Sequence, residues 1–243
     1  MFGMISVPVP PQSADRAPLV SVVMNCFNGA KFLRPAIASI LAQDHSDWEL
    51  IFWDNQSTDD SIAIAESYGD ARIRIHHAAR HVPLGAARNE AVALARGEWI
   101  AFLDTDDLWH PEKLRRQVAY LQANPRVDFL YTNLATFEGT EDWRQARPRY
   151  RSPQPVGQVF DQFLRAYPVN LQTVLVRRAP LSEMQEMFDP AFEVAEEFDL
   201  FLRFLHRRDA GYLHDVLWAI DCIRSRPAGP RSHCTRLKRS KLS

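Results

Sequence analysis

The sequence predicts an α/β protein in which helices flank a mainly parallel central sheet. Short runs rich in β-branched residues alternate four times with amphipathic helical stretches between residues 19 and 103, and the connections are short. Asn and Asp side chains gather directly after three of these runs. Ligands of parallel sheets bind outside the carboxyl ends of the strands, so these polar clusters mark the expected ligand site.

The first half of the predicted sheet follows from apolar patterning. Residues 19–24 form a run of the kind that is buried on both faces of a sheet. Apolar side chains then recur at helical spacing from Phe32 to Leu41. Further strands are expected at 49–53, 72–76 and 98–103, with helices through 62–65 and 85–96, the latter closed by Gly97.

The second half has a weaker pattern. A helix is expected from Pro111, strands at 127–133, 169–178 and 216–220, an exposed Arg-rich loop at 138–155, and a helix at 196–207. We expect a flexible leader at residues 1–17, one domain at 18–223 and a basic, disordered tail at 224–243. The tail carries seven Lys and Arg residues and no acidic one.

Composition limits the class of function. The chain has 243 residues, 46% of them apolar and 24% charged, which suffices to bury a core without disulfides. Lys and Arg number 29 against 30 Asp and Glu, and this balance argues against a nucleic-acid partner. The three cysteines are scattered along the chain, which predicts that they are reduced. The sequence shows neither the layout of a signal peptide nor an apolar run of ~18 residues, so a cytoplasmic protein is expected. Its basic tail is a candidate for peripheral contact with the anionic inner face of a membrane.

The sharpest candidate site is the acidic tetrad Asp104-Thr105-Asp106-Asp107, which directly follows a predicted strand. Its three carboxylates repel one another unless a cation neutralises them. Mg²⁺ and Mn²⁺ take carboxylate and diphosphate oxygens together, so we assign Asp104, Asp106 and Asp107 to a metal site. Asp104, Thr105 and Asp106 are assigned to a nucleotide diphosphate. The alternative is an acidic turn before the next helix.

Two other strand ends carry candidate contacts to a nucleotide. Asp54 can accept from the imide N–H of a uracil-like base and Asn55 can donate, while residues 57–59 are expected to cap the following helix. Asn25 and Phe27 follow the first strand. The Phe27 ring suits stacking on a base, with a core aromatic as the alternative.

Charged residues on two helices complete the candidate set. Arg88 suits a phosphate clamp, and the alternative is an ion pair with Asp104. Asp199 and Arg203 are four residues apart and can pair along a helix, which leaves Glu196 or Glu197 to face a cleft. A carboxylate there can remove a proton from an attacking hydroxyl, or can simply complement the helix N-terminus.

In their order and spacing, these motifs resemble the family 2 glycosyltransferases over about residues 18–223. The segments that carry the resemblance are 20–28, 54–59, 84–89, 97–107, 110–114 and 196–203. The resemblance implies the GT-A fold, a Rossmann-like nucleotide-diphospho-sugar transferase. It also implies a metal-dependent (Mn²⁺ or Mg²⁺), inverting enzyme that moves a sugar from a nucleotide diphosphate donor, most often a UDP-sugar, to a carbohydrate or lipid-linked acceptor in cell-surface polysaccharide, lipopolysaccharide or glycan synthesis.

The resemblance also assigns roles residue by residue. Glu197 stands where the family's catalytic base, usually Asp, is found. Asp54 matches the acid that contacts the base, and Phe27 replaces a stacking tyrosine. Asn25 replaces a proline and Asn55 an aspartate of the family pattern. A non-catalytic nucleotide-sugar binding protein of the same fold is the alternative.

Overall fold

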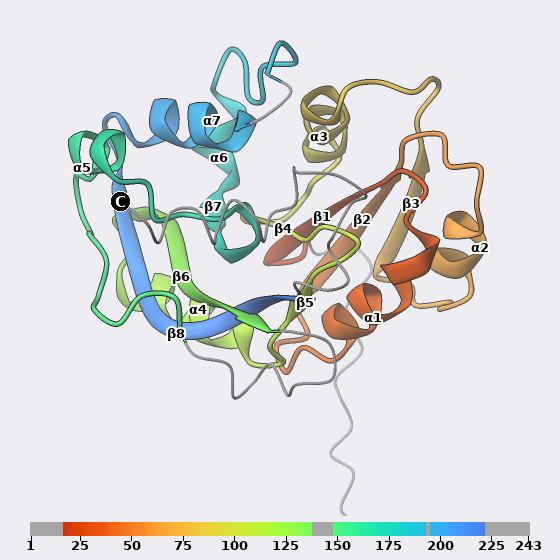
Figure 1. The fold of residues 1–243 in the computed structure, drawn as a ribbon, viewed down its shortest axis with the longest axis horizontal. Coiled ribbons are helices and arrows are strands. Elements are labelled where there is room, and N and C mark those ends of the chain that lie inside the picture. The colour runs from red at the N-terminus through yellow and green to blue at the C-terminus, as the bar shows by residue number, and fades with distance from the viewer. Residues whose placement is uncertain (1–16, 138–147, 193–194, 222–243) are drawn as a thin grey trace, which may run out of the picture.

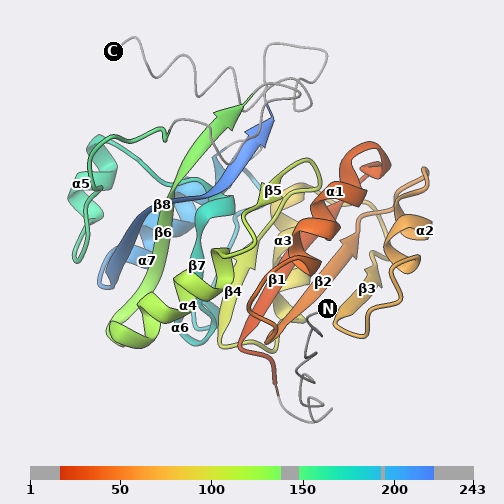
Figure 2. The ribbon, with the colours of Figure 1, turned by 90° about the horizontal axis from the view of Figure 1, so that it is seen from below.

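Among the residues that the structure describes, eight strands form one sheet in the order β3-β2-β1-β4-β7-β6-β8-β5 (Figures 1 and 2). The computed structural model describes residues 17–137, 148–192 and 195–221. The leader up to residue 16, most of the Arg-rich loop and the basic tail at 224–243 therefore lie outside the described residues. The elements that follow lie within residues 18–223, the range in which one domain is expected.

The strands are β1 (Val20–Cys26), β2 (Trp48–Asp54), β3 (Ile73–His77), β4 (Trp99–Phe102), β5 (Leu108–Trp109), β6 (Val127–Phe137), β7 (Leu175–Arg177) and β8 (Asp209–Asp221). The helices are α1 (Ala30–Leu41), α2 (Ser61–Glu66), α3 (Leu84–Ala93), α4 (Lys113–Ala123), α5 (Phe160–Arg165), α6 (Arg178–Ser182) and α7 (Glu196–Leu205), with the 3₁₀ turn η2 (Leu171–Thr173). The α/β class is as predicted.

The sheet is parallel in its first half and mixed in its second. β1 pairs in parallel with β2 and β4, and β2 with β3, as the apolar runs predict. β7 pairs antiparallel with β4 and β6, and β5 pairs antiparallel with β8. β6 pairs in parallel with β8, so four of the seven strand pairings among the described residues are parallel and the antiparallel ones lie in the second half. The expected strand at 169–178 is instead a 3₁₀ turn followed by the short β7, and the expected late strand is part of the longer β8.

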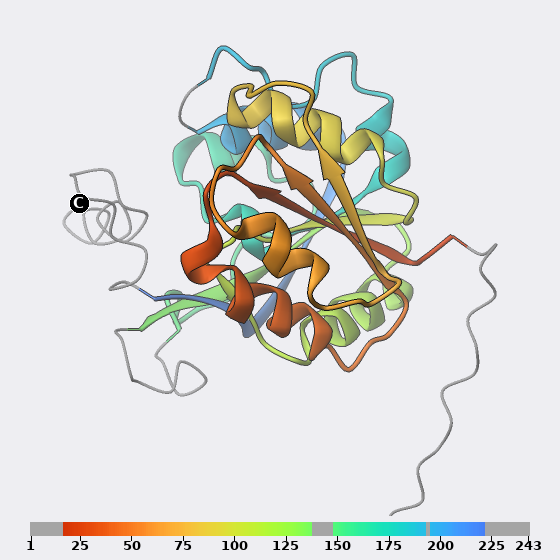
Figure 3. The same cartoon turned by 90° about the vertical axis from the view of Figure 1, so that its right-hand side faces the viewer.

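Helices cover both faces of the sheet (Figure 3). One buried cluster contains apolar side chains of α1, α2 and α4, and the other contains those of α3, α5, α6 and α7. Gly97 does not cap α3, whose C-cap is Leu94. A Cβ atom on Gly97 would lie 2.6 Å from the Ser21 backbone nitrogen, so close packing against β1 requires the glycine.

A buried carboxylate ties the amino ends of the strands together, at the end of the sheet opposite to the polar clusters. Glu49 on β2 accepts hydrogen bonds from the Ser21 hydroxyl (2.7 Å), from Arg74 (2.9 Å), and from the backbone (2.8 Å) and side chain (2.9 Å) of Arg96. Burial alone would raise the pKa of Glu49, but these donors favour its charged form and leave the pKa below its ordinary value.

Replacing Glu49 with Gln is expected to lower the free energy of unfolding by about 2 kcal/mol at neutral pH, because hydrogen bonds to a charged group are lost. Since the folded-state pKa is depressed, this contribution is present above the unfolded pKa and is lost as the pH falls through the folded one. Urea unfolding measures both effects.

The matched control is Glu98→Gln, which removes a half-exposed ion pair with Arg177 and should cost well under ~1 kcal/mol. Equal losses in the two variants would contradict the assignment.

Candidate functional site

The three predicted polar clusters lie at one edge of the sheet. They follow β1, β2 and β4, which are adjacent and point in the same direction. Cys26 at the end of β1 is in register with Asp54 at the end of β2. A Cβ atom on Gly29 would lie 3.0 Å from the Thr105 hydroxyl oxygen, so the loops after β1 and β4 also pack against each other.

Asp104 is held at two points by one buried amide. The Gln172 side chain donates to Asp104 Oδ2 (2.6 Å) and accepts from the Asp104 backbone N–H (3.0 Å). The other carboxylate oxygen accepts from Arg88 at 3.3 Å. Gln172 was not expected from the sequence, because it stands in a stretch that predicts a plain strand.

Arg88 joins the acidic tetrad to helix α7. Its side chain, on α3, is 5% exposed and bonds both Asp104 and Glu196, the first residue of α7. An ion pair with Asp104 is the alternative that the sequence offers for this residue, and the structure confirms the pair. Glu196 is a second partner that the sequence did not indicate. Contact of Arg88 with a phosphate stays a prediction.

The two remaining carboxylates of the tetrad differ in environment. Asp106 is half-buried, whereas Asp107 is 3% exposed. Burial raises the pKa of Asp107 well above its ordinary value, and the charges of Asp106 and Asp104 raise it further. The Trp218 indole lowers the pKa of Asp107, and this is the smallest of these effects. Asp107 Oδ1 has no hydrogen-bond partner of good geometry among the described residues.

This environment fits a divalent cation held by few protein ligands. A buried carboxylate whose charge is uncompensated gains most from a cation nearby. Within the described part of the chain, however, no group of three or more His, Cys, Asp or Glu side chains is arranged to hold a metal ion. The expected three-carboxylate set is therefore not preformed. Mg²⁺ commonly binds through one or two carboxylates with water and substrate phosphates, and that is the arrangement these residues fit.

The carboxylate at the end of β2 organises its own loop. Asp54 is buried, accepts from the Ser57 backbone N–H at 3.2 and 3.3 Å, and lies 3.8 Å from Nδ1 of His77. The Asn55 amide donates to the Val82 carbonyl (2.8 Å) and accepts from the Val82 N–H (3.1 Å). Asn55 thus holds a neighbouring loop, and the predicted nucleotide contacts of both residues stay predictions.

Helix capping by residues 57–59 is only partly as expected. The N-cap residue of α2 is Asp60, which makes no capping hydrogen bond with its side chain. The Asp59 side chain accepts from the backbone N–H of Ser61 (3.0 Å), the first residue of the helix. Ser57 and Thr58 instead bond to Asn28, since the Ser57 hydroxyl accepts from the Asn28 N–H and the Asn28 side chain accepts from Thr58. They link the loops after β1 and β2.

The residues after β1 present one ring to solvent. Phe27 is 52% exposed, and its ring centroid lies 4.3 Å from that of His81. The core-aromatic alternative for Phe27 is therefore wrong. Asn25 Nδ2 is buried without a hydrogen-bond partner among the described residues. The stacking role of Phe27 and the ligand contact of Asn25 remain predictions.

Helix α7 begins with a cluster of carboxylates. Asp199 bonds Arg203 at 2.6 Å, as the four-residue spacing predicts, and Glu196 bonds Arg88. Glu197 is half-buried beside Tyr167. Burial raises the pKa of Tyr167 well above its ordinary value, and the Glu197 charge adds to this shift.

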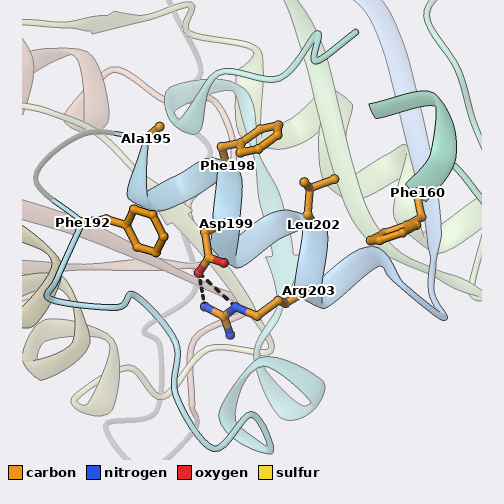
Figure 4. Close-up of a pocket in the computed structure, with 7 residues that line it drawn as sticks. All are labelled: Phe160, Phe192, Ala195, Phe198, Asp199, Leu202 and Arg203. Carbon is orange, nitrogen blue, oxygen red and sulfur yellow. Dashed lines mark hydrogen bonds and ion pairs between the residues drawn. The ribbon is translucent and has the colours of Figure 1, made fainter. Parts of the chain in front are cut away.

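A separate pocket of about 350 Å³ lies along α7 (Figure 4). It is lined by Phe160, Phe192, Ala195, Phe198, Asp199, Leu202 and Arg203. Its walls are mainly apolar, and the Asp199–Arg203 ion pair provides its charged groups. None of the predicted site residues lines it. Along the described segments, no helix is both long and apolar enough to cross a bilayer.

Comparison with known proteins shows the family of this chain. The model of the family described as Glycosyl transferase family 2 matches residues 21–180, and the chain belongs to this family. The glucosyltransferase WfgD of Escherichia coli, a UDP-Glc:α-D-GlcNAc-diphosphoundecaprenol β-1,3-glucosyltransferase by name, is 28% identical over 187 residues, which are 77% of this chain and 70% of that protein.

Two solved structures share the fold. S. aureus TarS 1-349 in complex with UDP has a TM-score of 0.69 at 21% identity, over 83% of this chain and 60% of that one. The mannosyltransferase PcManGT from Pyrobaculum calidifontis, in complex with GDP-Man and Mn²⁺, has a TM-score of 0.63 at 19% identity, over 93% and 62%. The chain thus spans about three fifths of either solved protein.

Proposed function

We propose that the protein transfers a sugar from a UDP-sugar to a hydroxyl of a carbohydrate or lipid-linked acceptor, with inversion at the anomeric carbon. The link made by Arg88 carries this proposal. Its guanidinium bonds Asp104 of the acidic tetrad and Glu196 at the start of α7. It therefore joins the proposed donor side to the helix of the proposed base. Sugar transfer requires the donor diphosphate and the base to be held in fixed positions around the anomeric carbon.

The donor base is proposed to bind at the ends of β1 and β2. The exposed Phe27 ring suits stacking, and buried Asp54 lies at the adjacent strand end. Asn25, Asn55 and Thr105 complete the proposed contacts around the nucleotide. The UDP complex of TarS, a protein of the same fold, supports uridine as the nucleoside.

Asp106 and Asp107 are the residues proposed to hold Mn²⁺ or Mg²⁺. When bound, a divalent cation offsets the negative charge that builds on the leaving diphosphate. The burial of Asp107, whose Oδ1 atom has no hydrogen-bond partner among the described residues, supports this assignment. Both oxygens of Asp104 already accept hydrogen bonds, so we propose that Asp104 orients the tetrad and contributes least to the metal. The Mn²⁺ in the PcManGT complex is consistent with the proposal.

Glu197 is proposed to take the proton from the acceptor hydroxyl. The neighbouring carboxylates are engaged in ion pairs of their own, Glu196 with Arg88 and Asp199 with Arg203. The deprotonated oxygen attacks the anomeric carbon on the face opposite to the diphosphate. A single displacement of this kind inverts the configuration and needs no covalent intermediate.

The proposed acceptor follows the name of one relative, and the proposed location follows the sequence. The name of WfgD describes a diphosphoundecaprenol-linked acceptor, which supports a lipid-linked acceptor and a role in cell-surface polysaccharide synthesis. We propose a cytoplasmic protein whose basic segment at 224–243 contacts the anionic inner face of the membrane.

A donor panel tests the function. The protein is incubated with UDP-, GDP- and TDP-sugars, Mn²⁺ and a polyprenyl-diphosphate sugar, and released nucleotide and the product's anomeric configuration are measured. We expect release of UDP that depends on acceptor, and an inverted product. Binding of nucleotide-sugars without release under any condition would instead establish a non-catalytic binding protein, and a retained configuration would contradict the single displacement.

A further inference from the structure

We infer that Gln172 is a positioning residue, whose amide sets the orientation of Asp104 and through it the donor-binding face of the acidic tetrad. The inference rests on the proposed binding of a nucleotide diphosphate at that tetrad. Gln172 is 1% exposed and contributes both of its polar groups to this one residue. The carbonyl oxygen accepts from the Asp104 backbone N–H, and the amide nitrogen donates to its carboxylate.

Two-point contact fixes more than a single hydrogen bond would. The bond to the backbone sets the direction of the chain as it leaves β4, and the bond to Oδ2 sets the side-chain rotamer. Arg88 then engages Oδ1 from the other side. Asp104 is therefore oriented by groups from α3 and η2, while its side chain stays 29% exposed toward the site edge.

Gln172 is itself held firmly, which a positioning residue requires. Its backbone N–H donates to the Asn170 side chain at 3.0 Å. The next residue, Thr173, accepts at its carbonyl from the buried Gln117 amide at 2.9 Å, and Gln117 also accepts from the buried Lys113 ammonium group. The turn that carries Gln172 thus has its polar groups bonded on both sides.

Two substitutions of Gln172 distinguish a positioning role from a role that only fills space. A methionine has nearly the volume of a glutamine but neither polar group. A glutamate keeps the acceptor for the Asp104 N–H and places a second carboxylate against Asp104. If Gln172 only fills space, Gln172→Met should bind nucleotide as well as the wild type. If it positions Asp104, both variants should bind more weakly.

The test is calorimetric titration of the full chain with UDP in the presence of Mn²⁺. We expect about a ten-fold or greater loss of UDP affinity in Gln172→Met and a larger one in Gln172→Glu. The combined variant Gln172→Glu with Asp104→Asn exchanges amide and carboxylate across the contact. The loss of UDP affinity in this double variant should be smaller than the summed losses of Gln172→Glu and Asp104→Asn. A purely structural role of Gln172 would not produce this difference.

Gln43→Met is the matched control, because Gln43 is also a buried amide that bonds backbone groups, those of His110 and Leu114, without touching the tetrad. The UDP affinity of Gln43→Met should equal that of the wild type. Thermal unfolding is measured for every variant to confirm that it folds. Wild-type affinity in both Gln172 variants, or additive losses in the exchange, would overturn the role of Gln172. A wild-type chain that binds no UDP would overturn the proposed function, and the inference with it.

Discussion

Replacing Asp106 with Asn is expected to lower kcat/KM for sugar transfer by about 10³-fold and to remove its dependence on Mn²⁺ or Mg²⁺. Asp106 is half-buried and is a proposed ligand of the cation, while Asp104 is bonded by Arg88 and Gln172. The amide keeps the size of the side chain and removes its charge, so the fold should persist. Initial rates across a range of metal concentrations, together with circular dichroism, measure both effects.

Asp128→Asn provides the control for this first prediction. Asp128 on β6 forms an ion pair with Arg177 on β7 at 2.8 Å. Neither residue belongs to the proposed site. Loss of this ion pair should leave transfer and metal dependence unchanged. Metal-dependent turnover at the wild-type rate in Asp106→Asn would remove this residue from the cation site.

Replacing Glu197 with Gln is expected to lower kcat by at least ~10²-fold while UDP affinity stays at the wild-type value. The amide cannot accept the acceptor's proton, but the residue takes no part in the proposed nucleotide contacts. Steady-state kinetics with varied acceptor, and UDP titration, separate the two quantities.

The neighbouring carboxylate serves as the comparison for this second variant. Asp199→Asn removes the ion pair with Arg203 on the same helix and should change kcat far less. If Glu197→Gln raised only KM, the base would have to be another group, and Glu196 with its Arg88 partner would be the first to test.

The parallel half of the fold and the convergence of the three polar clusters could be predicted from the sequence. β1, β2, β3 and β4 are runs of four to seven residues with recurring apolar side chains, and the carboxyl ends of β1, β2 and β4 carry the polar clusters. Parallel pairing alone then brings those clusters together. Three acids within four residues are conspicuous in any sequence, and Asp104, Asp106 and Asp107 were assigned for that reason.

Contacts between distant segments could not be predicted in the same way. Gln172 bonds Asp104 across 68 residues of sequence, and Glu196 bonds Arg88 across 108. Neither contact leaves a local pattern, because a single glutamine or glutamate is compatible with many environments. β5 and β7 have two and three residues, too few to show a period of two. The antiparallel pairings that make the sheet mixed were missed for this reason.

Anomalous diffraction from crystals grown with UDP and Mn²⁺ tests the central claim most directly. The account predicts a manganese peak within coordination distance of the Asp106 carboxylate, with the diphosphate oxygens on its other side and the uracil ring against Phe27. UDP bound away from the carboxyl ends of β1, β2 and β4, or bound there with no manganese beside the tetrad, would contradict it.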